Sequence, residues 1–226
     1  AASRAGVHLR LGAALQGAQP LSDGGFQLVL RSGEILHSAA LVLATGSHPS
    51  GHRLSVSLGH GMVPPVPSLF TLRLEGTSLP ALAGVSVDPV ELELRIPGCN
   101  VSHRQRGPLL ITHWGVSGPA VLRLTAHAAR DLRQAGYRAG LWIDWSGGRD
   151  PGSLRSWIGT QRKEQGRRQL ASARPWNGCG RRLWEQLLMQ ASVDPLHRWA
   201  DLTRQQEQSL IQALVASEYS VSGRGP

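Results

Sequence analysis

The sequence predicts an α/β protein in two parts, the second of which joins a β-rich unit to a group of helices. Three observations lead to this prediction. The apolar run "LVLATG" ends in glycine at residue 46, as buried strands of α/β sheets often do. The proline-rich segment "MVPPVPSLF" forces an extended chain near residue 70. Beyond it, strand-like alternation changes to helical spacing after Asp150.

The first part, up to a boundary near residue 70, is expected to hold short strands and one helix. A helix end comes first, then a strand at "GVHLRL" and a hairpin in which a Ser-Gly turn separates "FQLVL" from "EILH". Residues 40–46 are apolar throughout, which predicts a strand buried on both faces. A short helix is expected at "HRLSVSLGH".

The second part is expected to begin with strands at "SLFTLRL", "VELELRI", "GPLLIT" and "YRAGLWIDW". Helices should then start at Asp150-Pro151 and Asp194-Pro195, because proline fits the first helical position after an aspartate N-cap. Thr203 and Gln206 have the spacing of a capping box. Residues 71–217 therefore form a β-rich unit with a helical unit inserted near its end.

Four of the seven tryptophans have predictable places. Trp142 and Trp145 should face opposite sides of a strand, so at least one belongs in a core or domain contact. Trp184 and Trp199 lie in amphipathic helical patterns and are expected to be core anchors. None of them is assigned a chemical role.

The stretch "ITHWGVSGPAVLRL" is expected to be a turn between a strand and a helix. Residues 109–111 are a short apolar strand, and apolar residues recur at helical spacing from Val121. Ser117 or Gly118 suits the N-cap and Pro119 the first helical position. Free backbone N–H groups at such a helix start favour a negative or electron-rich ligand. Glycine and proline also simply make corners, and both interpretations stay open.

Other chemistries have weaker support in the sequence. Residues 115–119 approach the G-x-S-x-G elbow of serine hydrolases but lack its last glycine. His113 has no histidine or carboxylate at i+4 and no cysteine cluster near it. Cys99 and Cys179 lie far apart without a CxxC partner, so we expect free thiols. We therefore expect no metal site.

The chain carries a net charge of +9, which raises the alternative of a basic nucleic-acid-binding module. Basic residues gather at 162–168 and 180–184, and a solvated helical face explains each group as well. No apolar run reaches about 18 residues, and the first residues lack the order of a signal peptide. We expect a cytoplasmic protein with no membrane partner.

Four segments, in this order and spacing, resemble a family of bacterial FAD-dependent oxidoreductases, the HI-type flavoproteins with aminoacetone oxidase-like and bile-acid Δ4,6-reductase-like members. They are "LVLATGSHPSG", "LGHGMVPPVPSLFTLRL", "GPLLITHWGVSGPAVLRL" and "LWIDW". The resemblance implies part of a Rossmann-like FAD-binding domain and an inserted domain made of a small β-barrel and a helical bundle. Residues 1–70 would belong to the FAD-binding domain and 71–217 to the insert, and 218–226 would return toward the FAD-binding domain.

The same resemblance implies a cofactor-binding segment after the "LVLATG" run and a second segment on the insert. FAD would be contacted by Ala44, Thr45, Gly46, Ser47, Pro49, Gly51, Thr112 and Gly118. The loop from Thr112 to Gly118 would lie near the cleft where substrate and flavin meet. There His113 is the candidate proton donor or substrate-orienting group, and Ser117 and the Gly118 amide are candidate hydrogen-bond donors.

The reaction implied is hydride transfer between flavin and a small organic substrate, with NAD(P)H as a further expected partner. In flavoenzymes the flavin performs the redox step and the protein supplies position and electrostatics. Three features depart from the family. The sequence has no G-x-G-x-x-G fingerprint, and it ends before the C-terminal segment in which relatives complete the FAD site, so we expect an internal fragment of a longer enzyme, inactive alone. The segment after Pro49 is contracted, which suggests a subgroup with different flavin contacts. The alternatives are the nucleic-acid module and a non-catalytic scaffold that has lost its cofactor.

Overall fold

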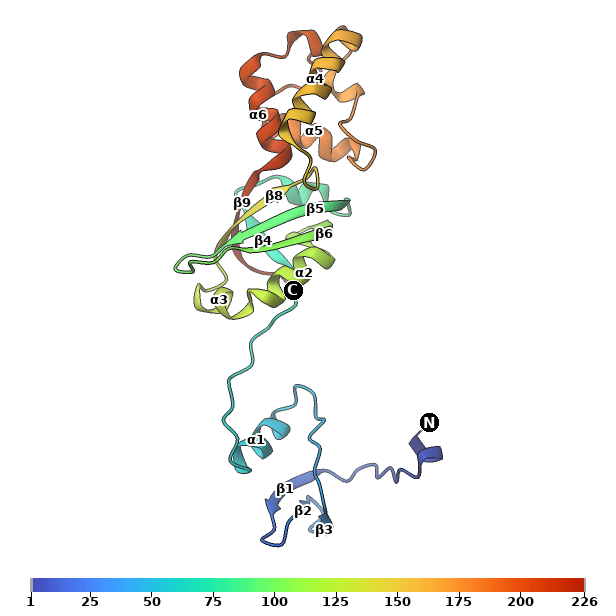
Figure 1. The fold of residues 1–226 in the computed structure, drawn as a ribbon, viewed down its shortest axis with the longest axis vertical. Coiled ribbons are helices and arrows are strands. Elements are labelled where there is room, and N and C mark those ends of the chain that lie inside the picture. Colours follow the sequence, from blue (N-terminus) through green and yellow to red (C-terminus); the bar gives the residue numbers. More distant parts are fainter. Residues whose placement is uncertain (1, 226) are drawn as a thin grey trace. The chain divides into compact units, whose positions relative to one another are not determined.

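The computed structural model describes residues 2–225 and divides the chain into two compact units, one ending at Pro65 and the other starting at Val66 (Figure 1). The division falls inside the proline-rich segment, where prolines at 64, 65 and 67 favour an extended backbone.

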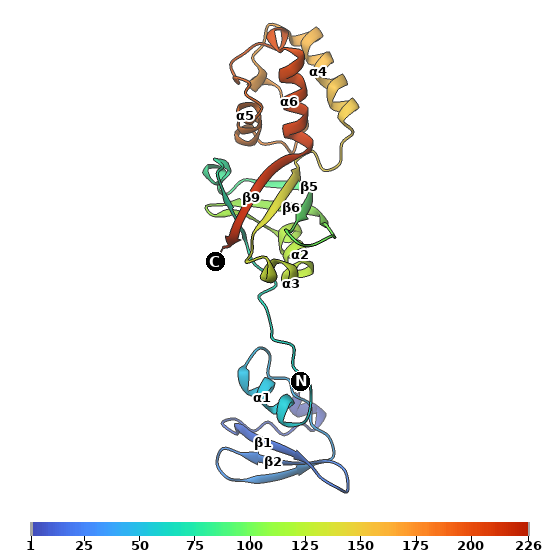
Figure 2. The ribbon, with the colours of Figure 1, turned by 90° about the vertical axis from the view of Figure 1, so that its left-hand side faces the viewer.

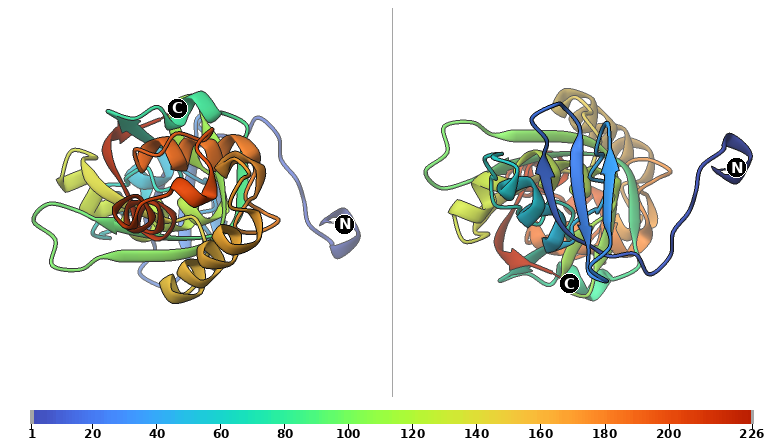
Figure 3. Two further views of the ribbon diagram at one scale, coloured as in Figure 1. Left: turned by 90° about the horizontal axis from the view of Figure 1, so that it is seen from above. Right: turned by 90° about the horizontal axis from the view of Figure 1, so that it is seen from below.

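The first unit contains a three-stranded antiparallel sheet in the order β1, β2, β3 (Figure 3, right). Its elements are η1 (Ala2–Ala5), β1 (Leu15–Pro20), β2 (Phe26–Leu30), β3 (Ile35–Ser38) and α1 (Pro49–Ser57). The predicted hairpin is confirmed as β2 and β3, and its turn places Gly33 at a φ of 87°. Glu34, the last residue of that turn, forms a bidentate ion pair with Arg10, at 2.9 and 2.6 Å. The helix expected near residues 52–60 is α1.

Two predicted strands of the first unit are wrong. Residues 6–11 and 40–46 form no strand. Leu11 and Val42 are each 85% accessible, and Leu41 and Leu43 are only half-buried. An extended segment becomes a strand only when a neighbour takes its backbone N–H and C=O groups. Within residues 2–225, no segment pairs with either one.

The second unit is built on a closed barrel of six strands among the described residues, in the order β4, β7, β6, β5, β8, β9 (Figure 2). The strands are β4 (Leu72–Glu75), β5 (Ser86–Arg95), β6 (His103–Thr112), β7 (Gly115–Ser117), β8 (Ala139–Asp144) and β9 (Ser217–Arg224). The barrel and helices confirm the fold class expected for the insert. β9 pairs with both β4 and β8 and closes the barrel. The last described residues thus belong to the barrel, since β9 is one of its strands.

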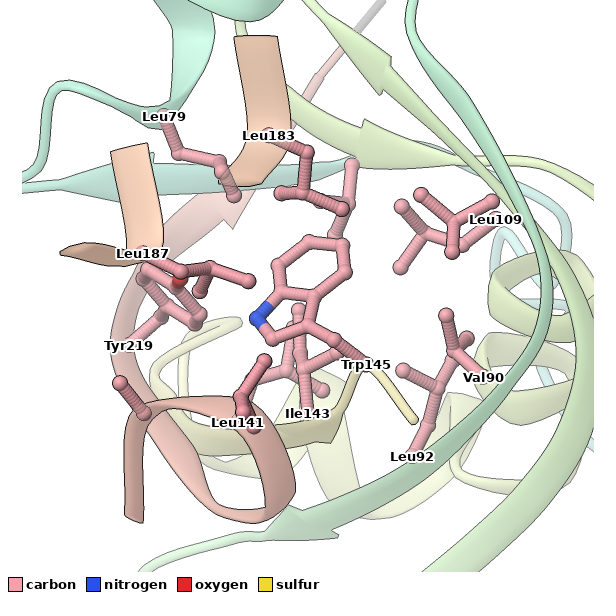
Figure 4. Close-up of a cluster of buried hydrophobic side chains, with 14 of the residues drawn as sticks. Leu79, Val90, Leu92, Leu109, Leu141, Ile143, Trp145, Leu183, Leu187 and Tyr219 are labelled. Carbon is pink, nitrogen blue, oxygen red and sulfur yellow. The ribbon is translucent and has the colours of Figure 1, made fainter. Parts of the chain in front are cut away.

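Alternate side chains of the barrel strands point inward and form one core (Figure 4). Leu92 and Leu94 of β5 lie opposite Ile143 and Leu141 of β8, and all four are buried. Trp145 is fully buried and meets the Tyr219 ring edge-on at 6.3 Å. Trp142 lies on the outside, where Arg95 stacks over it at 4.3 Å. The prediction that at least one of these two tryptophans is in a core is confirmed.

Two groups of helices flank the barrel at opposite ends (Figures 1 and 2). One end carries α2 (Pro119–His127) and α3 (Ala129–Gln134), and the other carries α4 (Pro151–Gln165), α5 (Arg181–Gln190) and α6 (Arg204–Val215). Short 3-10 turns occur at η2 (Leu79–Leu82), η3 (Leu170–Ser172) and η4 (Trp199–Asp201). No helix in the described chain is long and apolar enough to cross a membrane.

Two of the three helix starts predicted from capping residues in the second half of this unit are confirmed. Asp150 caps α4 by accepting from the Ser153 amide at 2.9 Å, and Thr203 and Gln206 form the expected capping box of α6. The helix predicted at Asp194-Pro195 is wrong, because Asp194 instead accepts from the Leu196 amide at 2.9 Å in a turn. Trp184 and Trp199 stack at 6.5 Å and are fully buried, which confirms them as core anchors.

Candidate functional site

The segment 112–118, which the sequence singles out, forms a tight hairpin between β6 and β7 of the second unit. Thr112 pairs with Gly115, so His113 and Trp114 alone form the turn. Both side chains are exposed. The Thr112 hydroxyl accepts from the Trp114 amide at 3.3 Å, and the Leu74 amide donates to the Trp114 carbonyl at 2.9 Å. The Trp114 backbone is therefore fixed by hydrogen bonds to the Thr112 side chain and to the backbone of β4.

Two glycines of the motif are required by the backbone. Gly115 has a φ of 150°, and a Cβ there would lie 2.7 Å from the Leu74 amide nitrogen. Gly118 has a φ of 97°, and its Cβ would lie 2.9 Å from the Leu110 amide nitrogen. A side chain at either position would collide with backbone that cannot move aside. These glycines therefore let β7 and the start of α2 lie close against the neighbouring strands.

The turn into α2 confirms the predicted helix start and decides its cap. Gly118 is the N-cap, Pro119 is the first helical residue, and the Gly118 carbonyl accepts from the Leu122 amide at 2.9 Å. Ser117 is half-buried on the outer face of the barrel, paired with Leu110. Among residues 2–225, no hydrogen bond joins Ser117 to His113. The two candidate residues are therefore independent groups and form no nucleophile–base pair.

Trp114 adds an aromatic surface beside His113. Its side chain is 46% accessible, and the Arg73 guanidinium lies over its ring at 5.1 Å. A cation over an indole face is attracted by the ring quadrupole and limits the rotation of both side chains. The hairpin tip therefore presents an imidazole, an indole and a guanidinium on a fixed backbone.

The other candidate residues lie in the first unit, in the loop that leads into α1. Ala44, Thr45, Gly46, Ser47 and Pro49 are exposed. Gly46 has a φ of 59° with open space where a Cβ would be. Gly51 is buried, and a Cβ there would meet the Thr45 side chain, 2.9 Å from its Cβ. Gly51 therefore allows α1 to pack against Thr45.

The backbone of this loop is accessible, whereas the first amides of α1 are already bonded. Its exposed residues are small, and the Gly46 backbone is open on the side of the missing side chain. At the start of α1, Pro49 has no N–H, His48 Nδ1 accepts from the Ser50 amide at 3.2 Å, and the His48 carbonyl accepts from the Gly51 amide at 3.1 Å. The amides that would cradle a phosphate at a helix start are already bonded.

A third group of side chains that could ligate a metal ion is not predicted by the sequence pattern. Cys99, His103 and Asp131 bring a sulfur, a nitrogen and a carboxylate oxygen within 4.8 Å of one another. The spacing of Cys99 and His103 is short, but Asp131 comes from α3, after the rest of the hairpin and α2. Only the folding of α3 against the β5–β6 end joins them, so no local motif could predict the set.

The two thiols lie in different surroundings, and both are free. Burial raises the pKa of Cys179 to about 12, although the charge of Arg174 acts in the opposite direction. Cys99 is half-buried and contacts the Val101 carbonyl and the Asp131 carboxylate, at 3.4 and 3.8 Å. The prediction of free thiols is confirmed.

A barrel closed by a returning strand, with helices inserted before that strand, defines the class of this second unit. Residues 66–226 match the family described as "HI0933-like protein barrel and H2TH domain". The chain belongs to this HI0933-like family, the FAD-dependent oxidoreductase family that its motifs resemble. A 3-dehydro-bile acid delta(4,6)-reductase of Clostridium scindens is 34% identical over 87 residues. That alignment covers 38% of this chain and 21% of the reductase, so the chain matches about a fifth of that relative's length.

Proposed function

We propose that this chain is part of an FAD-dependent oxidoreductase in which the β6–β7 hairpin tip contacts the substrate. The observation that carries the proposal is the tip itself. His113 and Trp114 are exposed, yet their backbone is held by β4 and by two glycines that admit no side chain. Catalytic groups are best placed on a rigid support with an accessible end.

The cofactor part of the proposal depends on the loop 44–47 of the first unit. Its small exposed residues and the left-handed Gly46 would contact FAD through their backbone, with Ser47 and Pro49 continuing along it. Thr112 and Gly118 were expected to contact FAD directly. Thr112 holds the turn and Gly118 holds the start of α2, so we propose that both act by positioning the hairpin. Bound flavin supplies the hydride chemistry.

His113 is proposed to donate a proton or a hydrogen bond to the substrate during hydride transfer. Histidine is the commonest general acid–base side chain in enzymes. Ser117 and the Gly118 amide, at the end of β7 away from the tip, are proposed as further hydrogen-bond donors. The match to a protein named a reductase supports the proposal that hydride passes to an organic substrate.

The test is rapid-reaction kinetics on the FAD-loaded protein that contains this chain. His113→Gln should slow substrate-dependent oxidation of the reduced flavin by roughly 100-fold, the usual size of a general acid's contribution. His127→Gln is the matched control, since His127 is another exposed histidine of the same unit, at the end of α2. Equal rates for wild type and His113→Gln would rule out a role for His113 in proton transfer.

The cofactor and its reductant are tested separately. We propose NAD(P)H as the reductant, and anaerobic mixing with NADH or NADPH should bleach the flavin if it is. A reductant of another class would leave the flavin oxidised in that mixture. If this chain is a non-catalytic scaffold, the full-length protein that contains it should bind no FAD. Flavin absorbance that co-purifies in stoichiometric amount would exclude the scaffold.

The nucleic-acid alternative has less support, because many of its arginines already serve the fold. Arg162 donates to the Leu202 carbonyl and pairs with Glu207 at 3.0 Å. Arg181 pairs with Glu185 at 2.7 Å, and Arg182 donates to the Ala81 carbonyl at 2.8 Å. Salt-dependent binding of duplex DNA or RNA at physiological ionic strength would favour the alternative.

A further inference from the structure

The cluster of Cys99, His103 and Asp131 lies away from the hairpin tip and has no part in the proposed reaction. Cys99 is in the loop after β5, His103 is the first residue of β6, and Asp131 is in α3. The His103 Nε2 to Asp131 Oδ2 distance is 2.9 Å, and the Cys99 Sγ to Asp131 Oδ2 distance is 3.8 Å. All three residues are half-buried.

Two distances between the ligand atoms are close to those within a tetrahedral zinc site. With Zn–S near 2.3 Å and Zn–N or Zn–O near 2.0–2.1 Å, neighbouring ligands of one zinc ion lie about 3.5 Å apart. The two distances above fall on either side of that value. Small side-chain rotations would therefore admit an ion between them.

The kinds of ligand select among metals. A thiolate and an imidazole are soft or borderline ligands, which suit Zn²⁺ and disfavour Mg²⁺ and Ca²⁺, whose preferred ligands are oxygens. The carboxylate contributes a further negative charge. The Asp131 side chain is 37% accessible and the His103 side chain 16%, so an ion can enter from solvent.

We propose that Cys99, His103 and Asp131 bind one Zn²⁺ ion, with the fourth position filled by water or another exogenous ligand. Binding would release the Cys99 thiol proton to solvent, because the thiolate is the form that binds metal. It would also replace the hydrogen bond between His103 and Asp131 by two bonds to the metal. The ion would then join the β5–β6 hairpin to α3 and stabilise the barrel.

The test is calorimetric titration of the chain with ZnCl₂ after treatment with a chelator. We expect one equivalent to bind, and we expect Cys99→Ser, His103→Gln and Asp131→Asn each to weaken binding at least about 10-fold. His127→Gln is the matched control, because His127 lies outside the cluster and should leave the affinity unchanged. Zinc should also raise the melting temperature of the wild type and not of Cys99→Ser.

Cobalt substitution identifies the ligands. Co²⁺ bound to the wild type should give an intense thiolate charge-transfer band and tetrahedral visible bands, and the charge-transfer band should vanish in Cys99→Ser. If Cys99→Ser does not fold, loss of the visible bands in Asp131→Asn replaces it. The proposal is overturned if zinc does not bind the wild type, if all the cluster variants bind like the wild type, or if the band requires Cys179 in place of Cys99.

Discussion

The Tyr219 hydroxyl in β9 donates a hydrogen bond to Oε1 of Gln190 in α5 at 3.1 Å, joining the barrel to the helical group. The other end of the same amide donates to the Ser217 hydroxyl at 3.1 Å, and Ser217 donates in turn to the Ala213 carbonyl of α6 at 2.7 Å. One glutamine side chain thus links the barrel strand β9 to both α5 and α6. Because β9 follows α6 directly, these bonds define how the chain leaves the helices and closes the barrel.

Tyr219→Phe should destabilise the protein by about 1 kcal/mol, because it removes one hydrogen bond and leaves the Gln190 oxygen without that donor. Urea unfolding of both proteins measures the difference. Tyr137→Phe is the matched control, since the buried Tyr137 hydroxyl has no hydrogen-bond partner among the described residues. That change should be neutral or stabilising. Equal losses in the two variants would mean that the Tyr219 bond contributes nothing specific.

Gly115→Ala should destabilise the second unit by roughly 2 kcal/mol or more, because it adds a side chain at positive φ against β4 backbone. The midpoint of thermal unfolding is the measurement. Gly180→Ala is its control, as Gly180 has a φ of −62° and nothing within 4 Å of its added Cβ. A well-folded Gly115→Ala variant with unchanged stability would contradict the close approach of β4 and β7.

Glu93 on the outside of β5 predicts a pH dependence. A hydrogen bond from Arg95, together with the charge of Arg104, lowers the pKa of this carboxyl. Because the pKa is lower in the folded protein than in the unfolded chain, the ionised carboxylate stabilises the fold at pH values above the ordinary pKa of glutamate. This stabilisation is lost as the pH falls through the lowered pKa. Glu93→Gln should therefore cost about 0.5 kcal/mol at pH 7 and less near pH 2. Chemical denaturation at both pH values measures this.

Glu75→Gln is the control for Glu93→Gln. The Glu75 carboxylate is 55% exposed and lies 4.0 Å from Arg138, so its removal should change stability little at either pH. If the cost of Glu93→Gln were the same at both pH values, the ionised form of Glu93 would not be the stabilising species.

The two cysteines should differ in reactivity towards a thiol reagent at pH 8 in metal-free protein. Cys99 should react within minutes, whereas Cys179 should react only after unfolding, because burial raises its pKa to about 12 and blocks access. Mass spectrometry of peptides after timed labelling distinguishes the two sites. Rapid labelling of Cys179 in the folded protein would show that its region opens readily.

The elements predicted correctly are those whose pattern is local. Asp150 and Thr203 form their capping hydrogen bonds with residues three positions later. Because these partners are close in sequence, the starts of α4 and α6 can be predicted from it. Asp194-Pro195 has the same local signal but forms a turn, because Asp194 bonds to the amide only two residues later. The segment 40–46 has the composition of a buried strand, and within the described chain it has no strand beside it.

The hairpin motif was located correctly but its residues were explained only by structure. Sequence predicted the strand, the corner and the Pro119 helix start. It did not predict β7, whose pairing with β4 explains Gly115, since β4 lies far away in the chain. The same limit hid the cluster at Cys99, because Asp131 joins it only through the packing of α3.

By itself, the sequence determined the fold class of the second unit, its family and the starts of α2, α4 and α6, since these depend on periodicity, caps and motifs of neighbouring residues. Tertiary structure decided which strand closes the barrel, which side chains share a site and which glycines are indispensable. Those properties depend on contacts between segments far apart in the chain, and the hydrogen bond from Tyr219 to Gln190 is one such contact.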